Sequence, residues 1–335
     1  MTRSADPVLR SDRLRIVDPS GVLAGPDPVE VVVSSPAVSV VIPTHNRPEL
    51  MRRAVETVLA QDYDGDIEVI VVFDACPPER PTVSVPAGRE LRLTTNVRSR
   101  GLAGARNTGI LAARHEYVAF LDDDDRWLPG KLAAQMAALA GHPDAVMVGT
   151  AVIFDDGTHQ HTRLVPGDLV THGALLRDRM GGLHSSTFLL RRAALLGPLG
   201  LVDEELPGSY GEDYDLLLRA SSIAPIPVVN EPLVAVAWSQ SSYFFGKWGA
   251  YADGLEYLWR QHAFWNDRRA DGRIAAQIAF ARAAHGEASQ ARRWVARAVR
   301  RDPTQIKAWL ALAISWRVLS AATVVTAVQR LGKGI

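Results

Sequence analysis

"YVAFLDDDDRW", at residues 117–127, decides which fold this chain can adopt. Its first five residues are apolar or aromatic, which is typical of a short buried strand. Four aspartates follow at once, at residues 122–125. Adjacent carboxylates repel one another and raise one another's pKa, so such a run needs solvent, a cation or a positive backbone field. The stretch therefore predicts a buried strand that ends where positive charge is required.

Three more apolar runs precede this strand along the chain. They are "VSVVI" at 38–42, "IEVIVVF" at 67–73 and "LRLTT" at 91–95, and all are short and rich in branched residues. Runs of this length and composition favour buried strands over helices.

Helical patterns separate these runs. The first helix is opened by Asn46, with Glu49 at the spacing of a capping box, and the second runs from about residue 102 to residue 113. Strands that alternate with helices predict an α/β fold: a right-handed, doubly wound, mostly parallel sheet with helices on both faces. Ligands of such sheets bind beyond the carboxyl ends of the strands.

Polar residues follow three of the four expected strands. "PTHNRP" at 43–48 follows the first, Asp74 follows the second, and the acidic run at 122–125 follows the fourth. Because the carboxyl ends of parallel strands lie on one side of a sheet, we expect all three segments to gather along one edge.

The acidic run has two interpretations. Aspartates favour the positive N-terminal end of a helix, and a helix is expected from about Pro129. One aspartate would be enough for that purpose, whereas four carboxylates at a strand end suit a hard divalent cation. Nearby, "NVRSRGLAGARNTG" at 96–109 offers arginines and backbone N–H groups to an anion such as diphosphate. We therefore favour the cation interpretation.

Composition narrows the class of partner. Lysine plus arginine equals aspartate plus glutamate, at 37 each among 335 residues, so no global basic field is expected to hold nucleic acid. The single cysteine, Cys76, excludes an intramolecular disulfide and favours an intracellular protein. Residues 1–35 lack the apolar core of a secretory signal and are expected to form a poorly ordered leader.

Four blocks follow one another along the chain: "VSVVIPTHNRPELMRRAVETVLAQ", "IEVIVVFDAC", "GLAGARNTGILAARHEYVAFLDDDDRWLPGKL" and "GEDYDLLLRAS". In this order they resemble glycosyltransferase family 2, which has the GT-A fold. The resemblance covers about residues 36–240. It implies transfer of a sugar from a nucleoside-diphosphate sugar to an acceptor hydroxyl, with inversion at the anomeric carbon, in a reaction that needs Mg²⁺ or Mn²⁺.

The resemblance also implies roles for residues around the nucleotide. Asp74, after the second strand, would hydrogen-bond the base. Thr44, at the end of the first strand, and Arg106, in "GARN", would touch the nucleotide, and Asn46 is a further candidate.

The DxD-type motif of the family falls within the acidic run. Counting back from Pro129, we expect Asp123 to contact the nucleoside and Asp124 to bind the metal. A run of four leaves the register open, so Asp122 and Asp125 remain further candidates.

The catalytic base implied by the resemblance is Asp213, the second acid of "GED". An acceptor hydroxyl must lose its proton as it attacks, and a positioned carboxylate can accept that proton. Glu212 and Asp215 are alternatives, and only one face of a helix can meet the site, so at least one of the three acids is expected to be structural. An N-capped amphipathic helix would also explain "GEDYDLLLR".

The acceptor side is less determined. "GGLHSSTFLLRRAAL" at 181–195 borders the acceptor in the family, and His184 is a candidate contact. A glycan, a lipid-linked sugar and a small molecule all remain open as acceptors, as do the base and the sugar of the donor.

From these patterns we expect a catalytic domain at 36–245, with a nucleotide half at 36–130 and an acceptor half at 131–245. Residues 246–335 are expected to form a helical region with one tetratricopeptide-like helix pair and an apolar last helix.

That last helix is expected over residues 308–328, which are long enough to span a bilayer but carry Arg317 near their middle. We therefore expect peripheral membrane contact or self-association through residues 304–331. The expected location is the cytoplasm, at the inner face of the plasma membrane.

Two other classes of protein share parts of this pattern. A catalytically silent nucleotide-sugar-binding or scaffold protein would act through its C-terminal helices, and the filled acidic positions count against it. A nucleotidyltransferase shares the sheet and the metal carboxylates, but "PTHNRP" does not resemble its glycine-rich loop.

Overall fold

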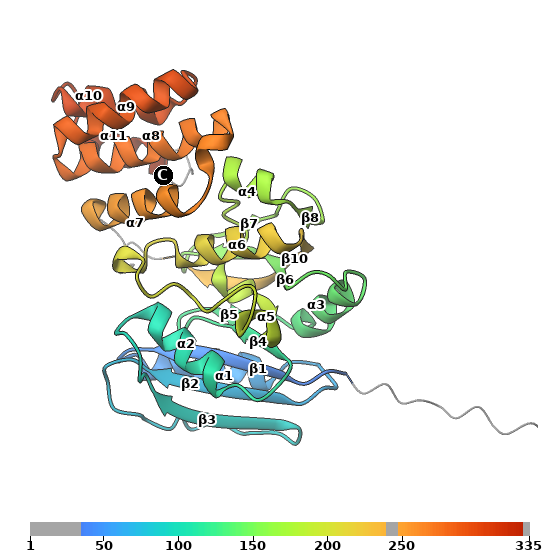
Figure 1. Ribbon diagram of the computed structural model, residues 1–335. Helices are drawn as coiled ribbons and strands as arrows, with labels where there is room; N and C mark the ends of the chain where they lie inside the picture. Colours follow the sequence, from blue (N-terminus) through green and yellow to red (C-terminus); the bar gives the residue numbers. More distant parts are fainter. Residues whose placement is uncertain (1–34, 239–246, 331–335) are drawn as a thin grey trace, which may run out of the picture. The chain divides into compact units, whose positions relative to one another are not determined.

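A computed structural model of the chain describes residues 35–238 and 247–330. The predicted leader therefore lies outside the described residues, apart from Ser35. The described strands form one sheet in the order β3-β2-β1-β4-β9-β6-β10-β5, with β7 paired to β6 and β8 to β10 (Figure 1). Their bounds are β1 Val38–Thr44, β2 Ile67–Phe73, β3 Arg89–Thr95, β4 Tyr117–Phe120, β5 Arg126–Trp127, β6 Met147–Asp155, β7 Gln160–Arg163, β8 Leu169–Val170, β9 Leu189–Arg191 and β10 Ile226–Ala237.

The predicted α/β fold is confirmed, and its parallel part is well defined. Strand β1 pairs in parallel with β2 and β4, and β2 pairs in parallel with β3. Beyond β4 the sheet is mixed, because β9 runs antiparallel to both β4 and β6. The four predicted strands thus form a parallel half. In the second half β10 pairs in parallel with β6, and the other pairs are antiparallel.

Helices follow the strands as the sequence predicts. In the first part of the chain they are α1 Pro48–Leu59, α2 Leu102–Ala112, α3 Lys131–Ala140, α4 His172–Arg177, α5 Arg192–Leu195 and α6 Glu212–Ile223, with short 3₁₀ turns η1 Ser185–Thr187 and η2 Pro207–Ser209. In the last part they are α7 Trp248–Gln261, η3 Phe264–Asn266, α8 Arg268–His285, α9 Ala288–Arg301, α10 Ile306–Ser315 and α11 Ala321–Arg330.

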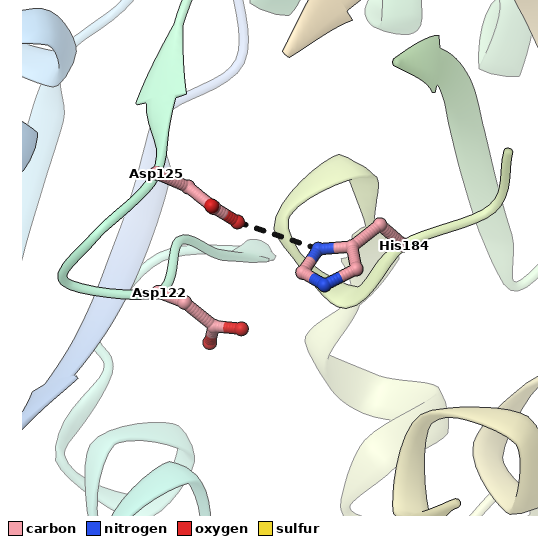
Figure 2. Close-up of side chains that lie close together, drawn as sticks. All are labelled: Asp122, Asp125 and His184. Atoms are coloured by element: carbon pink, nitrogen blue, oxygen red, sulfur yellow. Dashed lines mark ion pairs between the residues drawn. The ribbon is translucent and has the colours of Figure 1, made fainter. Parts of the chain in front are cut away.

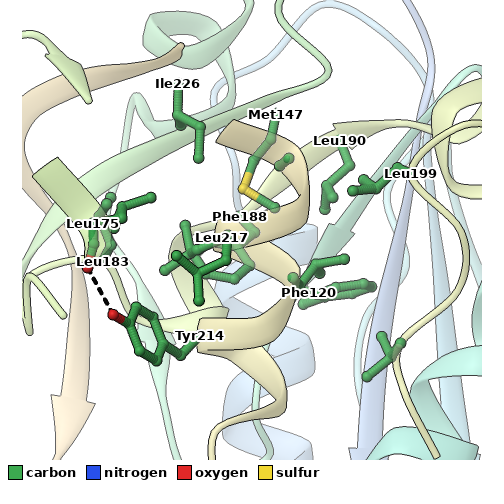
Figure 3. Packing of buried hydrophobic residues seen from close by; sticks show 14 of the residues in the cluster. Phe120, Met147, Leu175, Leu183, Phe188, Leu190, Leu199, Tyr214, Leu217 and Ile226 are labelled. Carbon is green, nitrogen blue, oxygen red and sulfur yellow. Dashed lines mark hydrogen bonds between the residues drawn. The ribbon is translucent and has the colours of Figure 1, made fainter. Parts of the chain in front are cut away.

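Side chains of the central strands alternate between two cores. Val40 and Ile42 of β1 belong to the core under α1 and α3, whereas Val41 belongs to the core under α2, α4 and α6. This alternation is the two-residue period of a strand. Figure 3 shows the second core, where Phe120 of β4 and Leu217 of α6 are among the packed side chains.

Helix α1 does not begin as the sequence suggested. Its N-cap is Arg47 rather than Asn46, no side chain caps it, and Pro48 occupies its first turn. Asn46 instead has a positive φ of 53°. Proline presets the φ of a first helical residue, and asparagine tolerates the left-handed region, so the chain turns at Asn46 and the helix begins at the proline. The predicted capping box with Glu49 is therefore wrong.

The capping interpretation of the acidic run is also wrong. Helix α3 has Gly130 at its N-cap, and the Gly130 N–H donates to Asp62 Oδ1 at 2.6 Å. A carboxylate from another segment thus satisfies this helix end, and the run at 122–125 requires a different explanation.

Helix α2 packs closely on β1 because it lacks a side chain at Gly109. A Cβ at Gly109 would lie 2.2 Å from Val41 Cγ1. We expect Gly109→Ala to lower the free energy of unfolding by about 1–3 kcal/mol, the usual effect of overpacking a core. Gly173→Ala, in α4, is the matched control, since its Cβ would meet nothing within 4 Å. Urea unfolding measures both, and equal stabilities would contradict this packing.

The predicted apolar last helix is in fact two helices, α10 and α11. Arg317 takes a positive φ of 60°, its N–H donates to Ile314 O, and the Val318 N–H donates to Ala313 O. These two bonds form a Schellman motif, which ends a helix. Among the described residues, no helix has both the length and the apolar content needed to cross a membrane.

The C-terminal helices share the second core of the sheet. Leu258 of α7, Phe264 of η3 and Ile274 of α8 are fully buried in the same cluster as Phe120 of β4. Helices α8 and α9 form a helix pair, joined by a turn with Gly286 at a φ of 95°. Its likeness to a tetratricopeptide repeat stays a prediction.

Candidate active site

The three predicted segments meet at the carboxyl ends of β1, β2 and β4. Thr44, the last residue of β1, is buried, and its hydroxyl donates to Asp123 Oδ2 at 2.7 Å. The Asp74 N–H donates to Thr44 O at 2.9 Å. Segments more than 70 positions apart along the chain are thereby joined at one edge, as a doubly wound sheet requires.

Asp74 holds the loop that precedes α2. Its Oδ1 accepts from Asn96 Nδ2 at 2.8 Å, and its Oδ2 accepts from the Gly101 N–H at 3.0 Å. Gly101 has a φ of 118°, which favours glycine, and it is the N-cap of α2. The Asp74 carboxylate therefore holds the start of α2 near the carboxyl end of β2.

Arg47 pairs with the two middle carboxylates of the acidic run. Its Nη1 lies 3.1 Å from Asp123 Oδ1 and 3.1 Å from Asp124 Oδ2. Burial raises the pKa of Asp123, against the effect of the Thr44 hydrogen bond and of Arg47. Burial, Asp122 and Asp123 raise the pKa of Asp124. One half-exposed arginine therefore does not fully compensate the charge of these carboxylates.

Arg106 joins the acidic run to the "GED" turn. Its guanidinium is 2% exposed; Nη2 donates to Asp122 Oδ1 at 2.5 Å and to Ser185 Oγ at 2.9 Å, and Nη1 donates to Glu212 Oε1. Burial alone lowers the pKa of Arg106, but Asp122 and Glu212 outweigh it and raise the pKa above its usual value. Arg106 is thus a buried cation between two acidic segments.

Asp125 is buried at the end of the run. Its Oδ2 accepts from Ser186 Oγ at 2.6 Å, and its Oδ1 accepts from the Ala237 N–H at 3.0 Å. Burial, followed by Asp122 and Asp124, raises its pKa well above the ordinary range. This carboxyl group therefore lacks positive charge among its protein neighbours.

The side chains of Asp122, Asp125 and His184 lie close together, as Figure 2 shows. Asp122, Asp125 and His184 each offer one ligand atom, and these atoms lie within 4.8 Å of one another. His184 Nδ1 is 3.4 Å from Asp125 Oδ2. Burial lowers the pKa of His184, which favours the neutral imidazole that binds metals. Two carboxylates and an imidazole suit Mn²⁺, so the donor set fits a divalent cation.

This cluster differs from the ligand expected from the sequence. Asp124, the expected metal ligand, is not part of it and instead contacts Arg47, with 38% of its side chain exposed. Among the described residues, the group of ligand atoms that could hold a cation is that of Asp122, Asp125 and His184, and the role of Asp124 stays a prediction.

Asp213 lies in the first turn of α6, at the "GED" turn. Gly211 precedes the helix with a φ of 90°. Asp213 Oδ2 accepts from Arg179 Nη2, and Asp213 Oδ1 accepts from the Tyr214 N–H at 2.7 Å. The carboxylate is 20% exposed, so solvent or an acceptor can reach it.

The neighbouring acids have other partners. Glu212 is buried on Arg106; burial raises its pKa to about 8 against the effect of that arginine. Asp215 is buried, with Arg219 Nε at 2.8 Å and His262 Nε2 at 2.9 Å. Asp215 thus bonds to two side chains of the protein, and its assignment as the structural acid of the three stays a prediction.

Two predicted contacts are placed differently. Asn46 is exposed and bonds His45 Nε2 at 3.2 Å, and it contacts none of the carboxylates above. Arg106 is enclosed by carboxylates, and its contact with the nucleotide stays a prediction.

Several side chains of the site were missed by the sequence reasoning. For Arg47 the sequence contained a signal: Pro48 marks the start of α1, so the residue before it must lie close to the end of β1. The serine pair of "HSST" directly follows His184. Arg179 had no local signal, because its partner is 34 positions away. The missed residues are Arg47, Arg179, Ser185 and Ser186.

The sequence model "Glycosyl transferase family 2" matches residues 39–196. This part of the chain belongs to glycosyl transferase family 2. The match includes β1 except Val38, all of β2 to β4, the acidic run and His184. The carboxylates at the ends of these strands therefore lie within the matched residues.

Curated relatives are similar over the same region. An uncharacterized glycosyltransferase of Rickettsia typhi is 31% identical over 197 residues, which cover 56% of this chain and 61% of that one. One from Rickettsia prowazekii is 29% identical and covers 60% and 64%. The chain thus spans less than two thirds of these relatives' length. WfgD of Escherichia coli, named a UDP-Glc:alpha-D-GlcNAc-diphosphoundecaprenol beta-1,3-glucosyltransferase, is 28% identical and covers 58% and 73%.

Solved structures are similar over more of the chain. TarS 1–349 of S. aureus, in complex with UDP-GlcNAc, matches with a TM-score of 0.57 and 16% identity. The match covers 89% of this chain and 92% of that one. The fold expected from the family 2 resemblance, GT-A with a helical C-terminal region, is therefore confirmed.

Proposed function

We propose that this protein is an inverting glycosyltransferase that moves a sugar from a nucleoside-diphosphate sugar to an acceptor hydroxyl. The observation that carries the proposal is the Arg106 bridge between Asp122 of the acidic run and Glu212 of the "GED" turn. This bridge brings the expected donor site and the expected base, Asp213, to the same end of the sheet.

In this proposal, residues at the strand ends bind the donor. Asp74 hydrogen-bonds the base, and Thr44 orients Asp123 toward the nucleoside through its hydroxyl. Arg106 acts beneath the site, since it is buried, and keeps the negative charge of Asp122 compensated. The name of the WfgD relative supports a UDP-sugar as donor.

Asp213 accepts the proton of the attacking hydroxyl. Arg179 and the Tyr214 N–H each bind one of its oxygens, so the carboxylate has a defined orientation before an acceptor arrives. A carboxylate has further lone pairs, and these are free to accept from a hydroxyl. Proton removal during attack is general base catalysis, which typically contributes 10²–10⁴-fold.

A divalent cation fits the carboxylates beside the base. Asp122, Asp125 and His184 would hold it, with Asp124 as the ligand expected from the sequence. When bound, Mg²⁺ or Mn²⁺ supplies charge that stabilises the departing diphosphate. The protein residues hold the ligands in place: Ser185 and Ser186 bind Asp122 and Asp125 through their hydroxyls.

Measurements of Mn²⁺ binding test whether the ion is held by the cluster of Asp122, Asp125 and His184 or by Asp124. We expect Asp125→Asn to weaken Mn²⁺ binding at least about tenfold, because it removes a charged ligand, while Asp144→Asn, an exposed control, leaves binding unchanged. Because the pKa of Asp125 is raised, Mn²⁺ must displace its proton, and affinity should fall with decreasing pH before ordinary carboxyl groups titrate. Calorimetry with Mn²⁺ alone measures both. Weakening by Asp124→Asn but not by Asp125→Asn would assign the ion to Asp124.

A panel of nucleoside diphosphates tests the function. Binding to the native state raises the melting temperature by mass action, so one nucleotide, which we expect to be UDP, should stand out in the presence of Mn²⁺. The corresponding sugar donor should then release nucleoside diphosphate over time. No shift with any nucleotide would contradict the proposal, and a shift without turnover would favour a silent nucleotide-sugar-binding protein.

We also propose that the acceptor is lipid-linked and that the protein acts at the inner face of the plasma membrane. The named acceptor of the WfgD relative, a diphosphoundecaprenol, supports this. Trp309 and Trp316 are 48% and 62% exposed, beside the exposed Arg317. We expect the chain to pellet with anionic vesicles and Trp316→Ser to weaken pelleting. If no chain pellets, the placement is wrong.

A further inference from the structure

We infer that Arg273, in helix α8, is a positioning residue for the Asp213 carboxylate, acting through Tyr214 and Arg179. This inference rests on the proposed function, since it assumes that Asp213 is the base. It assigns part of the active site to the C-terminal helices, outside the residues matched by the family 2 model.

Three acids in the first turn of α6 each bond a side chain from a different segment. Glu212 bonds Arg106 of α2, Asp213 bonds Arg179 of the loop after α4, and Asp215 bonds His262 at the end of α7. Three segments thus hold successive acids. Tyr214 lies between them in sequence, directly after the base.

Tyr214 connects this turn to helix α8. Its side chain is 3% exposed, and its hydroxyl donates to Leu175 O at 2.7 Å, as Figure 3 shows. The same hydroxyl accepts from Arg273 Nη2 at 2.7 Å. Arg273 Nη2 also donates to Leu176 O at 3.0 Å. Arg273 therefore ties the far end of the tyrosine ring to the end of α4.

Arg179 links the same ring to the base. Its guanidinium carbon lies 5.5 Å from the centroid of the Tyr214 ring, and that of Arg273 lies 5.8 Å from it. Arg179 Nη2 donates to Asp213 Oδ2, and its Nη1 donates to Leu183 O at 3.1 Å. The ring thus supports the arginine that orients the carboxylate.

The consequence follows from the geometry that catalysis requires. A base must lie within hydrogen-bond reach of its proton, and a shift of about 1 Å can reduce the rate about 10²-fold. If Arg273 is lost, the Tyr214 hydroxyl keeps only Leu175 O, and the ring is free to tilt. Arg179 and Asp213 then lose their fixed orientation, while the donor site at the strand ends keeps all its contacts.

The test measures release of UDP from UDP-glucose and from UDP-N-acetylglucosamine with Mn²⁺, using the full chain. Arg273→Gln and Tyr214→Phe each remove the bond between the two residues. We expect each to lower kcat about tenfold to a hundredfold, with the donor KM and the affinity for UDP within about twofold of the original. Arg269→Gln, an exposed position in the same helix, is the matched control and should change nothing.

A double mutant of Arg273 and Asp213 distinguishes a positioning role of Arg273 from a role in folding alone. Adding Arg273→Gln to Asp213→Asn should lower kcat no further, because the residue acts only through that carboxylate. Arg273→Lys, which keeps the charge and one donor, should recover part of the rate. The inference is overturned, and the proposed function is not, if a folded Arg273→Gln variant keeps its kcat. The same holds if the variant loses as much affinity for UDP as it loses kcat. Full activity of Asp213→Asn overturns the inference and the assignment of Asp213 as the base, whereas the proposed function fails if the unaltered chain binds no nucleoside diphosphate and releases none from a sugar donor.

Discussion

We expect Asp213→Asn to lower turnover of the sugar donor by about 10²–10⁴-fold, the usual contribution of a general base. Asparagine has nearly the same shape, but its amide has one oxygen in place of two, so it can accept from either Arg179 or the Tyr214 N–H while the other donor loses its partner. One bond to the side chain therefore remains, and the first turn of α6 should persist. The asparagine cannot accept a proton from the attacking hydroxyl. The loss should therefore lie in kcat, with the affinity for nucleoside diphosphate unchanged.

Steady-state kinetics and a nucleotide titration measure these two effects. Asp144→Asn, at an exposed position before β6, is the control for loss of one negative charge. Glu212→Gln is a second comparison, because Glu212 is buried on Arg106 and should act on stability rather than on proton transfer. Activity retained by Asp213→Asn but lost by Glu212→Gln would move the base to Glu212.

Arg106→Met should have the largest effect on stability. It removes the cation between Asp122 and Glu212, and removal of one partner of a buried ion pair typically costs about 3–5 kcal/mol. The remaining carboxylates would be buried without compensation, and the hydrogen bond to Ser185 would also be lost. We expect the free energy of unfolding to fall by that amount.

Urea unfolding measures the change, with Arg52→Met as the control. Arg52 pairs with Glu49 and Glu56 on the surface of α1, where an ion pair contributes little, so its stability should stay close to the original. Adding Glu212→Gln to Arg106→Met should recover part of the loss, since the amide carries no charge. Equal stabilities of Arg106→Met and Arg52→Met would show that Arg106 does not compensate buried charge.

Local sequence patterns were sufficient for the elements of the sheet. The four predicted strands are β1 to β4. Strands β1, β2 and β4 are buried along their whole length, as apolar runs in a sheet covered on both faces are expected to be. The expectation of burial is wrong for β3, which lies at the edge of the sheet and buries only Leu91. The position of Asp74 and of the acidic run at strand ends followed from the same runs. Errors arose where a local rule competed with another: Pro48 displaced the cap expected at Asn46, and the turn at Arg317 divided the expected last helix.

The sequence by itself determined which carboxylates lie at the strand ends, since that depends only on the order of strands and helices. Only the tertiary structure decided which of them act together. Asp125 meets His184 and Arg179 meets Asp213 across separate segments, and Arg106 is buried between Asp122 and Glu212. Side-chain orientation and burial depend on packing between segments distant along the chain, and no local pattern contains that information.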